Sequence, residues 1–259
     1  MAIGVGSNSY SAHFQGISRK KKKAKPRFSG VLFQTGKRLF DIFISFLAIV
    51  LILSWLVPIL AILIKLDSKG PVFFVQTRIG FLGIPFRCYK LRTMVVNQDA
   101  DSRQASYNDV RITRLGHYLR LTSLDELPQF LNVFIGNMSI VGPRPFMKKD
   151  DQAFSIVISN YPLRYCAKPG ITGMAQVKGY RGKTDNFLSI FHRYQWDTFY
   201  IRNARPALDF KIIRLTAQQM LKRIFTFRTF KIQHFERMKQ EHLEKMRLSQ
   251  ADLLVENFR

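Results

Sequence analysis

A long apolar run, from Ile42 to Ile64, limits what this chain can fold into more than any other feature of its sequence. Ser45, Ser54 and Pro58 are its only interruptions, and it is long enough to cross the apolar core of a bilayer, which is roughly 30 Å thick. A fully buried helix of a soluble protein is the alternative. The run predicts a membrane helix near the start of the chain.

Basic residues flank this run at both ends, with Lys37 and Arg38 before it and Lys65 after it. Lysine and arginine are enriched on the cytoplasmic flanks of membrane segments, so both ends are expected on the cytoplasmic side. Pro58 lacks a backbone N–H and clashes with the carbonyl one turn earlier, and Ser54 can satisfy a freed backbone group. These features favour a helix that enters the bilayer, bends and leaves by the same face. A simple crossing is the alternative.

The charge balance points to anionic partners, because the chain of 259 residues has a formal net charge of +24. No acidic residue precedes Asp41, and the segment from Arg19 to Arg27 is almost entirely basic. This segment is either a solvated tail or a patch that binds anionic lipids of the inner leaflet. The two cysteines, Cys88 and Cys166, lie far apart and form neither a disulfide framework nor a zinc spacing, which fits a reducing compartment.

Composition divides the chain into four parts. Residues 1–36 are expected to be a disordered basic tail and 37–66 the membrane helix, while 67–221 form a compact domain. Residues 222–259 predict a basic amphipathic helix that lies on the membrane, is solvated or self-associates.

The compact domain is predicted to be mixed α/β and helix-rich. Residues 70–80 and 84–94 predict a short β-hairpin around a glycine-containing turn. Apolar spacing predicts amphipathic helices, some of them at the membrane interface, over 112–121, 147–165, 187–202 and 208–221. The second of these helices is expected to begin with exposed Asp150 and Asp151.

An adjacent acid pair, Asp125 and Glu126, is unusual in so basic a protein. Ser123 precedes it in the Ser-x-x-Glu pattern of a capping box, so Glu126 could be a helix cap and Asp125 a residue that favours the positive end of the helix dipole. Pro128 complicates this interpretation, because it follows so closely that the helix could instead begin after it or bend there.

Basic residues near the acid pair support a functional interpretation. Arg120 precedes it, and Arg144 follows it in the rigid turn Gly142-Pro-Arg-Pro145. A carboxylate pair with arginines on either side can hold a divalent metal and a phosphate together. Arg78, Arg87, Lys90 and Arg92 are concentrated in the predicted hairpin, and one or two of these are expected to contact anions.

Several motifs occur between residues 37 and 221, and together they are specific although each alone is not. They are Lys37-Arg-Leu-Phe-Asp41, Gly70-Pro-Val-Phe-Phe74, Gln76-x-Arg-Ile-Gly80, Tyr89-Lys-Leu-Arg-Thr-Met94, Ser123-Leu-Asp-Glu-Leu-Pro-Gln129, Met138-Ser-Ile-Val-Gly-Pro-Arg-Pro145 and Lys168-Pro-Gly-Ile-Thr-Gly173. In residues and in order they resemble the monotopic polyprenyl-phosphate phosphoglycosyl transferases, also called the bacterial sugar transferase family.

The resemblance implies a re-entrant helix in the bacterial inner membrane and a small catalytic domain on its cytoplasmic face. It implies transfer of a sugar 1-phosphate from a UDP-sugar to undecaprenyl phosphate, with Mg²⁺ and release of UMP, as the initiating step of exopolysaccharide, capsule or O-antigen synthesis. Asp125 matches the family nucleophile, which forms a covalent phosphosugar intermediate, and Glu126 its partner acid, both near the metal. Arg120 and Arg144 match phosphate-binding positions, and Lys90 and Arg92 belong to the basic motif near the active site.

Three features differ from the family pattern or refine it. The larger members carry further N-terminal membrane helices and another domain, so this chain is expected to be the compact form. Met174 stands where many relatives have tryptophan. Residues 179–185 resemble the hexose-transferring branch, which favours glucose or galactose as the sugar.

Two other functional classes are compatible with parts of the sequence. One is a non-catalytic membrane scaffold for polysaccharide assembly. The other is a basic, membrane-associated nucleic-acid-binding protein, which the charge and the interleaved aromatic residues favour. No nucleic-acid module is recognisable, so no nucleic-acid partner is predicted.

Overall fold

The computed structural model describes residues 31–97, 105, 109–182 and 187–226. The chain divides into two compact units, residues 1–217 and 218–259, and the described part of the second unit, 218–226, is helical. Residues 1–30 of the predicted basic tail, and the predicted C-terminal helix beyond residue 226, lie outside the described residues.

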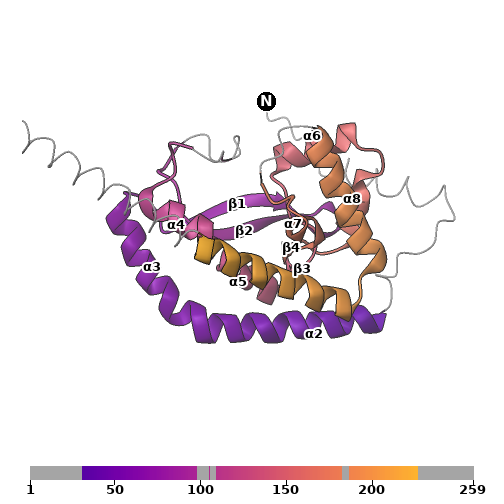
Figure 1. Ribbon diagram of the computed structural model, residues 1–259, viewed down its shortest axis with the longest axis horizontal. Helices are drawn as coiled ribbons and strands as arrows, with labels where there is room; N and C mark the ends of the chain where they lie inside the picture. Colours follow the sequence, from indigo (N-terminus) through magenta and orange to yellow (C-terminus); the bar gives the residue numbers. More distant parts are fainter. Residues whose placement is uncertain (1–30, 98–104, 106–108, 183–186, 227–259) are drawn as a thin grey trace, which may run out of the picture. The chain divides into compact units, whose positions relative to one another are not determined.

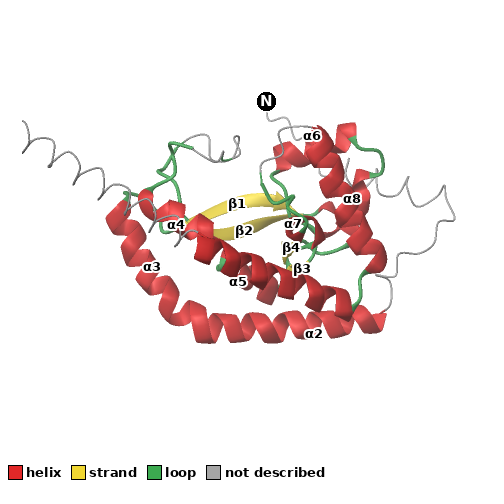
Figure 2. Cartoon of the chain, viewed as in Figure 1, coloured by secondary structure: helices red, strands yellow, loops and turns green. Residues whose placement is uncertain are grey.

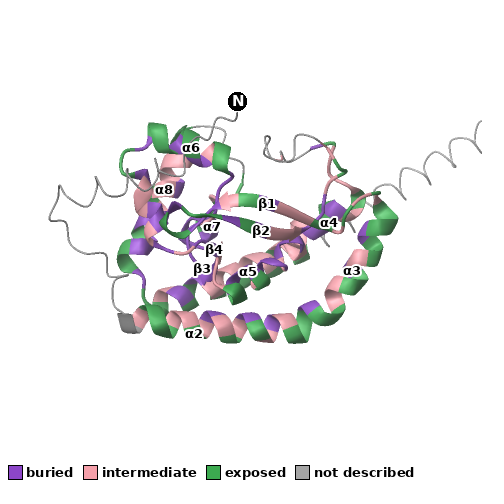
Figure 3. Ribbon diagram, turned by 180° about the vertical axis from the view of Figure 1, so that it is seen from behind, coloured by how far each residue is buried: buried purple, intermediate pink, exposed green. Residues whose placement is uncertain are grey.

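A long bent helix at the start of the first unit carries the apolar run (Figure 1). It consists of α2 (Val31–Ala48), a π-helical turn (Ile49–Leu53) and α3 (Ser54–Asp67). Within the described residues, one helix, Phe33–Asp67, is long and apolar enough to cross a membrane, and 22% of its apolar window is buried in protein. Exposed and half-buried positions run along much of its length (Figure 3). Most of its apolar surface therefore has no protein cover.

The bend in this helix coincides with the π-helical turn between α2 and α3 (Figure 2). There the N–H of Ser54 donates to the carbonyl of Ile49, five residues back, and such wide turns bend helices. The Ser54 hydroxyl also donates to the carbonyl of Val50 at 2.6 Å. Ser54 thus bonds a backbone carbonyl, although not the one that Pro58 leaves without its helical partner, and Pro58 lies inside α3 and does not break it.

Two small sheets lie at the centre of the first unit (Figure 1). β1 (Phe73–Ile79) pairs antiparallel with β2 (Pro85–Leu91), which confirms the predicted hairpin. β3 (Ser139–Val141) pairs in parallel with β4 (Gly170–Thr172). This second pairing was not predicted, because its strands are short and joined by a long crossover rather than by a turn.

Short helices surround these sheets: α4 (Arg114–Thr122), α5 (Gln129–Ile135), α6 (Lys148–Val157), α7 (Met174–Val177), α8 (Phe187–Asn203) and a helix that begins at residue 206. The main apolar core includes Val133 of α5, Val141 of β3, Tyr200 of α8 and Ile212. α5 contacts both α2 and β2. The prediction of a mixed, helix-rich α/β fold is confirmed.

Polar contacts hold the first half of the bent helix against the rest of the unit. Lys37 forms an ion pair of 2.7 Å with Asp209, and Arg38 donates to two carbonyls at the end of α5, at 2.6 and 2.8 Å. The buried Asp41 carboxylate accepts from the N–H of Ile140 at 3.0 Å. These contacts join α2 directly to β3 and α5, the elements that flank the acid pair and the Arg144 turn in sequence.

The helix predicted over 147–165 is divided in two. After α6, Asn160 adopts a left-handed φ of 63°, and Tyr161–Cys166 form a 3₁₀ helix. The expectation that Asp151 is exposed is also wrong. Asp151 is buried, because the 3₁₀ helix packs on α6 and the hydroxyls of Tyr161 and Tyr165 both donate to its carboxylate.

Candidate active site

The acid pair lies in a short turn between α4 and α5. Ser123 follows the last residue of α4 with a left-handed φ of 62°, and Leu124–Glu126 form one 3₁₀ turn before α5 begins at Gln129. Ser123 makes no capping hydrogen bond, and its buried Oγ has no partner among the described residues. The capping-box interpretation is wrong, because Ser123 closes α4 instead of opening a helix. The predicted later start of the helix, after Pro128, is confirmed.

Glu126 is surrounded by positive side chains from three segments. Its Oε1 accepts from Lys90 Nζ at 2.8 Å and from Arg144 Nη2 at 2.9 Å, and its Oε2 accepts from Arg181 Nη2 at 3.2 Å. Burial alone would raise the pKa of Glu126, but Arg144, Lys90 and Arg181 together hold that pKa well below its ordinary value. Glu126 is therefore a fixed anion that gathers three cations.

Asp125, the neighbouring residue, has the opposite environment. It is buried, and its carboxylate accepts no hydrogen bond from the described part of the chain. Burial raises the pKa of Asp125, Lys90 opposes that shift and Glu126 adds to it. Arg120 also lowers this pKa, and its guanidinium donates to Thr93 Oγ1 at 3.4 Å. Strongly perturbed carboxyl groups of this kind are typical of functional sites.

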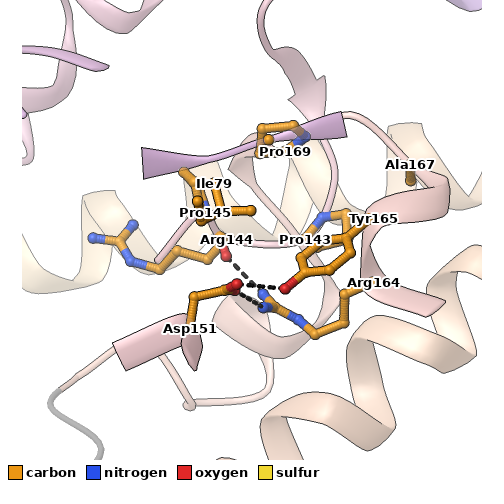
Figure 4. A pocket seen from close by; sticks show the side chains of 10 residues that line it. Ile79, Pro143, Arg144, Pro145, Asp151, Arg164, Tyr165, Ala167 and Pro169 are labelled. Atoms are coloured by element: carbon orange, nitrogen blue, oxygen red, sulfur yellow. Dashed lines mark hydrogen bonds and ion pairs between the residues drawn. The ribbon is translucent and has the colours of Figure 1, made fainter. Parts of the chain in front are cut away.

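Each cation that bonds to Glu126 comes from a different element. Lys90 lies on β2, Arg144 follows β3 and Arg181 follows α7. The Arg144 turn packs so tightly on the loop before β4 that a Cβ at Gly142 would lie 2.2 Å from the carbonyl of Lys168. The side chain of Arg144 extends away from the small cavity under this turn (Figure 4). Close backbone packing thus fixes the point from which Arg144 reaches the acid pair.

Arg92, predicted as a phosphate-binding residue, is not brought into this cluster. Its buried guanidinium donates to the carbonyl of Lys69 at 2.5 Å and to that of Ser68 at 2.7 Å. These carbonyls belong to the two residues that follow α3, outside its helical hydrogen bonds. The physical reason for the difference is that Arg92 stands just beyond the last residue of β2, whereas Lys90 still belongs to the strand.

Two arginines near the acid pair were not among the predicted site residues. Arg181 belongs to the 179–185 segment, which had been considered only for its resemblance to the hexose branch. Arg78, on β1, donates to the carbonyl of Pro145 at 2.8 Å, next to Arg144. Burial lowers the pKa of Arg78, and the charge of Arg144 lowers it further. The concentration of basic residues in the hairpin was the available signal, but only the folded pairing of strands shows which of them face the acids.

Magnesium was predicted at Asp125 and Glu126. In the described ranges no three His, Cys, Asp or Glu side chains gather as metal ligands, so this acid pair could supply two at most. Mg²⁺ is usually held by one or two carboxylates together with substrate phosphates. Because both oxygens of Glu126 already accept from cations, Asp125 has the more available oxygens. The acid pair would fit a Mg²⁺ that is also held by substrate phosphates.

Comparisons with known proteins place the acid pair and its cations inside one continuous region that matches a known family. The sequence model of the bacterial sugar transferase family matches residues 32–223. A UDP-glucose:undecaprenyl-phosphate glucose-1-phosphate transferase of Klebsiella pneumoniae is 47% identical over 181 residues, which are 70% of this chain and 39% of that protein.

Shorter relatives align over more of their length. A transferase of the same name from Caulobacter vibrioides is 44% identical over 189 residues, 71% of this chain and 69% of that protein. The exopolysaccharide production protein PSS of Rhizobium leguminosarum bv. phaseoli is 42% identical over 182 residues, 68% of this chain and 90% of that protein. The chain thus spans about two fifths of the Klebsiella relative and most of the Rhizobium one. Because the family model covers nearly all of the bent helix, both sheets, and the acid pair with the cations around it, the chain belongs to the bacterial sugar transferase family.

Proposed function

We propose that this protein transfers a sugar 1-phosphate from a UDP-sugar to undecaprenyl phosphate and releases UMP, as the initiating step of exopolysaccharide, capsule or O-antigen synthesis. The observation that carries the proposal is the pair of adjacent carboxyl groups with opposite environments, one bonded to three cations and the other to none. The names of two relatives make UDP-glucose the first donor to test. UDP-galactose is the second.

The reaction would proceed in two displacements at one phosphorus. An oxygen of Asp125 attacks the phosphorus that carries the sugar, the bond from this phosphorus to the bridging oxygen breaks, and UMP leaves. An oxygen of undecaprenyl phosphate then attacks the same phosphorus, the bond to Asp125 breaks, and the carboxylate is restored. Asp125 suits this role because its lone pairs are not engaged by hydrogen bonds from the described chain, and a covalent intermediate divides a difficult transfer into two easier steps.

The cations gathered by Glu126 would compensate charge on the phosphates. Glu126 already holds Lys90, Arg144 and Arg181 close together. A substrate phosphate beside Glu126 would therefore meet donors that need little reorganisation. Arg120 adds positive charge near Asp125. Mg²⁺, when bound by Asp125 and the diphosphate, would neutralise part of the phosphate charge.

The apolar helix suits an enzyme whose acceptor is a lipid. The phosphate of undecaprenyl phosphate lies at a membrane surface, so an enzyme anchored in the inner leaflet would meet it there. The bend at the π-helical turn, the exposed apolar side chains and the basic flanks all favour a re-entrant helix in the bacterial inner membrane, with the sheets on the cytoplasmic face. Cysteines introduced one at a time by Thr35→Cys and Lys69→Cys, in a protein whose partly exposed Cys166 is replaced by serine, test this. Both should react with an impermeant thiol reagent from the cytoplasmic side, and a crossing helix would expose them on opposite sides.

The decisive experiment is a UMP-release assay on the purified full chain. With UDP-glucose alone, release should stop at about one UMP per protein, because the covalent intermediate accumulates, and undecaprenyl phosphate should restore turnover. A chelator of divalent metals should abolish the turnover. No UMP from any UDP-sugar in a panel of hexose and N-acetylhexosamine donors would overturn the proposal.

A further inference from the structure

Behind the cluster on Glu126 lies a second group of charges, which the proposed reaction does not use. Arg164, in the 3₁₀ helix after α6, donates from Nε to Asp197 at 2.9 Å, from Nη1 to the Tyr161 hydroxyl at 2.8 Å and from Nη2 to the carbonyl of Arg144 at 2.7 Å. Figure 4 shows the Arg164 guanidinium directed at that carbonyl, while the Arg144 side chain extends away. A guanidinium with three hydrogen bonds to different groups is held in place, so Arg164 supports the backbone of a residue whose side chain pairs with Glu126.

Arg193, on α8, makes the corresponding contact behind the other site arginine. Its Nη2 donates at 2.6 Å to the carbonyl of Gly182, the residue after Arg181. Arg193 and Asp197 are four residues apart on α8 and therefore lie on one face of that helix. Each arginine that pairs with Glu126 is thus supported by a buried arginine: Arg164 bonds to the carbonyl of Arg144, and Arg193 bonds to the carbonyl of the residue after Arg181.

Phe146 and Asp197 connect the two buried arginines. The guanidinium carbons of Arg164 and Arg193 lie 4.4 and 5.2 Å from the centre of the Phe146 ring, within the range of cation–π contacts. Asp197 is 1% exposed, and its charge favours the charged forms of both arginines. Phe146 also follows Arg144 in sequence by two residues. The backbone supports of Arg144 and Arg181 therefore belong to one packed unit.

Stability does not account well for Arg193. Its side chain is buried, and its Nε has no hydrogen-bond partner among the described residues. Burial, together with the like charges of Arg144 and Arg164, lowers the pKa of Arg193 to about 10, against the effect of Asp197. A buried cation with an unmade hydrogen bond is a poor source of folding free energy.

We propose that Arg164, Arg193 and Asp197 are positioning residues, which set how Arg144 and Arg181 approach Glu126 and the substrate phosphate without touching the substrate themselves. The inference rests on the proposed function for what the two site arginines bind. How they are held follows from the hydrogen bonds alone.

The test compares variants of Arg193 in the full chain. Arg193→Met keeps the apolar stem but leaves the Gly182 carbonyl without its donor, and Arg193→Lys keeps one donor. Arg202→Met, at an exposed position of the same helix, is the matched control. We expect Arg193→Met to have a Tm no lower than that of the wild type and a kcat/KM for UDP-glucose about 10²-fold lower, the loss typical of a misplaced group. Arg193→Lys should recover part of it, and the control should match the wild type.

A second readout does not depend on turnover. Amide hydrogen exchange of a peptide covering residues 178–182 should be faster in Arg193→Met than in the wild type and unchanged in Arg202→Met. Wild-type kcat/KM with unchanged exchange would overturn the positioning role, and so would a fall in Tm that accounts for the lost activity. A wild-type protein without transferase activity would overturn the proposed function instead, and the exchange experiment would still decide whether Arg193 holds the Arg181 segment.

Discussion

Replacing Asp125 by asparagine should stabilise the protein while it abolishes transfer, and this combination tests the site more sharply than the loss of activity alone. In the native protein the ionised carboxylate is buried beside another anion, and the described chain offers it no hydrogen bond. A raised pKa means that ionisation of Asp125 at neutral pH opposes folding. The amide has nearly the same shape and removes that cost.

The expected gain is modest, because the attraction of Lys90, Arg120 and Arg181 is lost together with the cost of burial. A gain of about 1 kcal/mol is typical when an unfavourable charge is removed, and it corresponds to roughly 2–4 °C in Tm for a unit of this size. Glu126→Gln should do the opposite. It leaves Lys90 and Arg144 without their anion, and breaking such a buried pair costs about 3 kcal/mol, or roughly 6–12 °C.

Differential scanning fluorimetry of the two variants in one detergent, with the UMP-release assay run in parallel, gives both quantities. Asp125→Asn should melt above the wild type and release no UMP, and Glu126→Gln should melt below it. A clear fall in Tm for Asp125→Asn would refute the argument that burial is the dominant effect on this carboxyl. Retained turnover would refute its role as the nucleophile.

Three further predictions concern pH and single arginines. The stability that Glu126 contributes is fully present above its unfolded pKa of about 4.5 and is lost as pH falls through its lower folded pKa. In urea titrations from pH 7 to 3, the free energy of unfolding should therefore fall less steeply with acid in Glu126→Gln than in the wild type. An equal fall in the two proteins would contradict the ion cluster. Asp125 acts in the opposite sense, because its folded pKa is raised. The stability it contributes is fully present below its unfolded pKa of about 3.8 and is lost as pH rises through the folded pKa. Arg144→Ala should lower kcat/KM by roughly 10²–10³-fold while the protein stays in the membrane fraction, and unchanged kinetics would argue against a phosphate contact. Arg92→Met should lower the free energy of unfolding by about 2 kcal/mol, because it leaves the carbonyls of Ser68 and Lys69, just after α3, without their donor. KM for UDP-glucose should not change. An unchanged free energy of unfolding with a raised KM would instead support the predicted phosphate contact of Arg92.

Local features of this fold could be predicted from sequence because each depends on neighbouring residues. The hairpin follows from two β-rich segments around a turn, and the start of α5 follows from Pro128, because proline is better tolerated at the start of a helix than in its interior. Ser123 shows the limit of the same reasoning. Its pattern is that of a capping box, but α4 already ends there, and closing that helix requires a left-handed residue rather than an N-cap.

Which charged residues pair with which depended on tertiary structure, and the sequence located only some of them near the acid pair. Lys90 and Arg92 are two residues apart, a spacing that keeps side chains on one face of a strand, yet β2 ends between them and they reach different partners. Arg181 is far from Glu126 in sequence, and nothing near it indicates an acidic partner. The contact of Arg193 with the Gly182 carbonyl likewise exists only because α8 packs beside that segment.

The geometry also gives a reason, separate from the family resemblance, to assign the two acids different roles. Adjacent titratable groups whose pKa values are driven apart are suited to different tasks. Oε1 of Glu126 is held by two ion pairs and Oε2 by one, so an attack by either oxygen would disturb contacts that give the cations their common anchor. Asp125 can react without disturbing that group, and each new negative charge on the phosphate strengthens its attraction to cations that are already in place. The acid that holds the cations is therefore poorly suited to be the nucleophile, and its neighbour is well suited because it lacks such bonds.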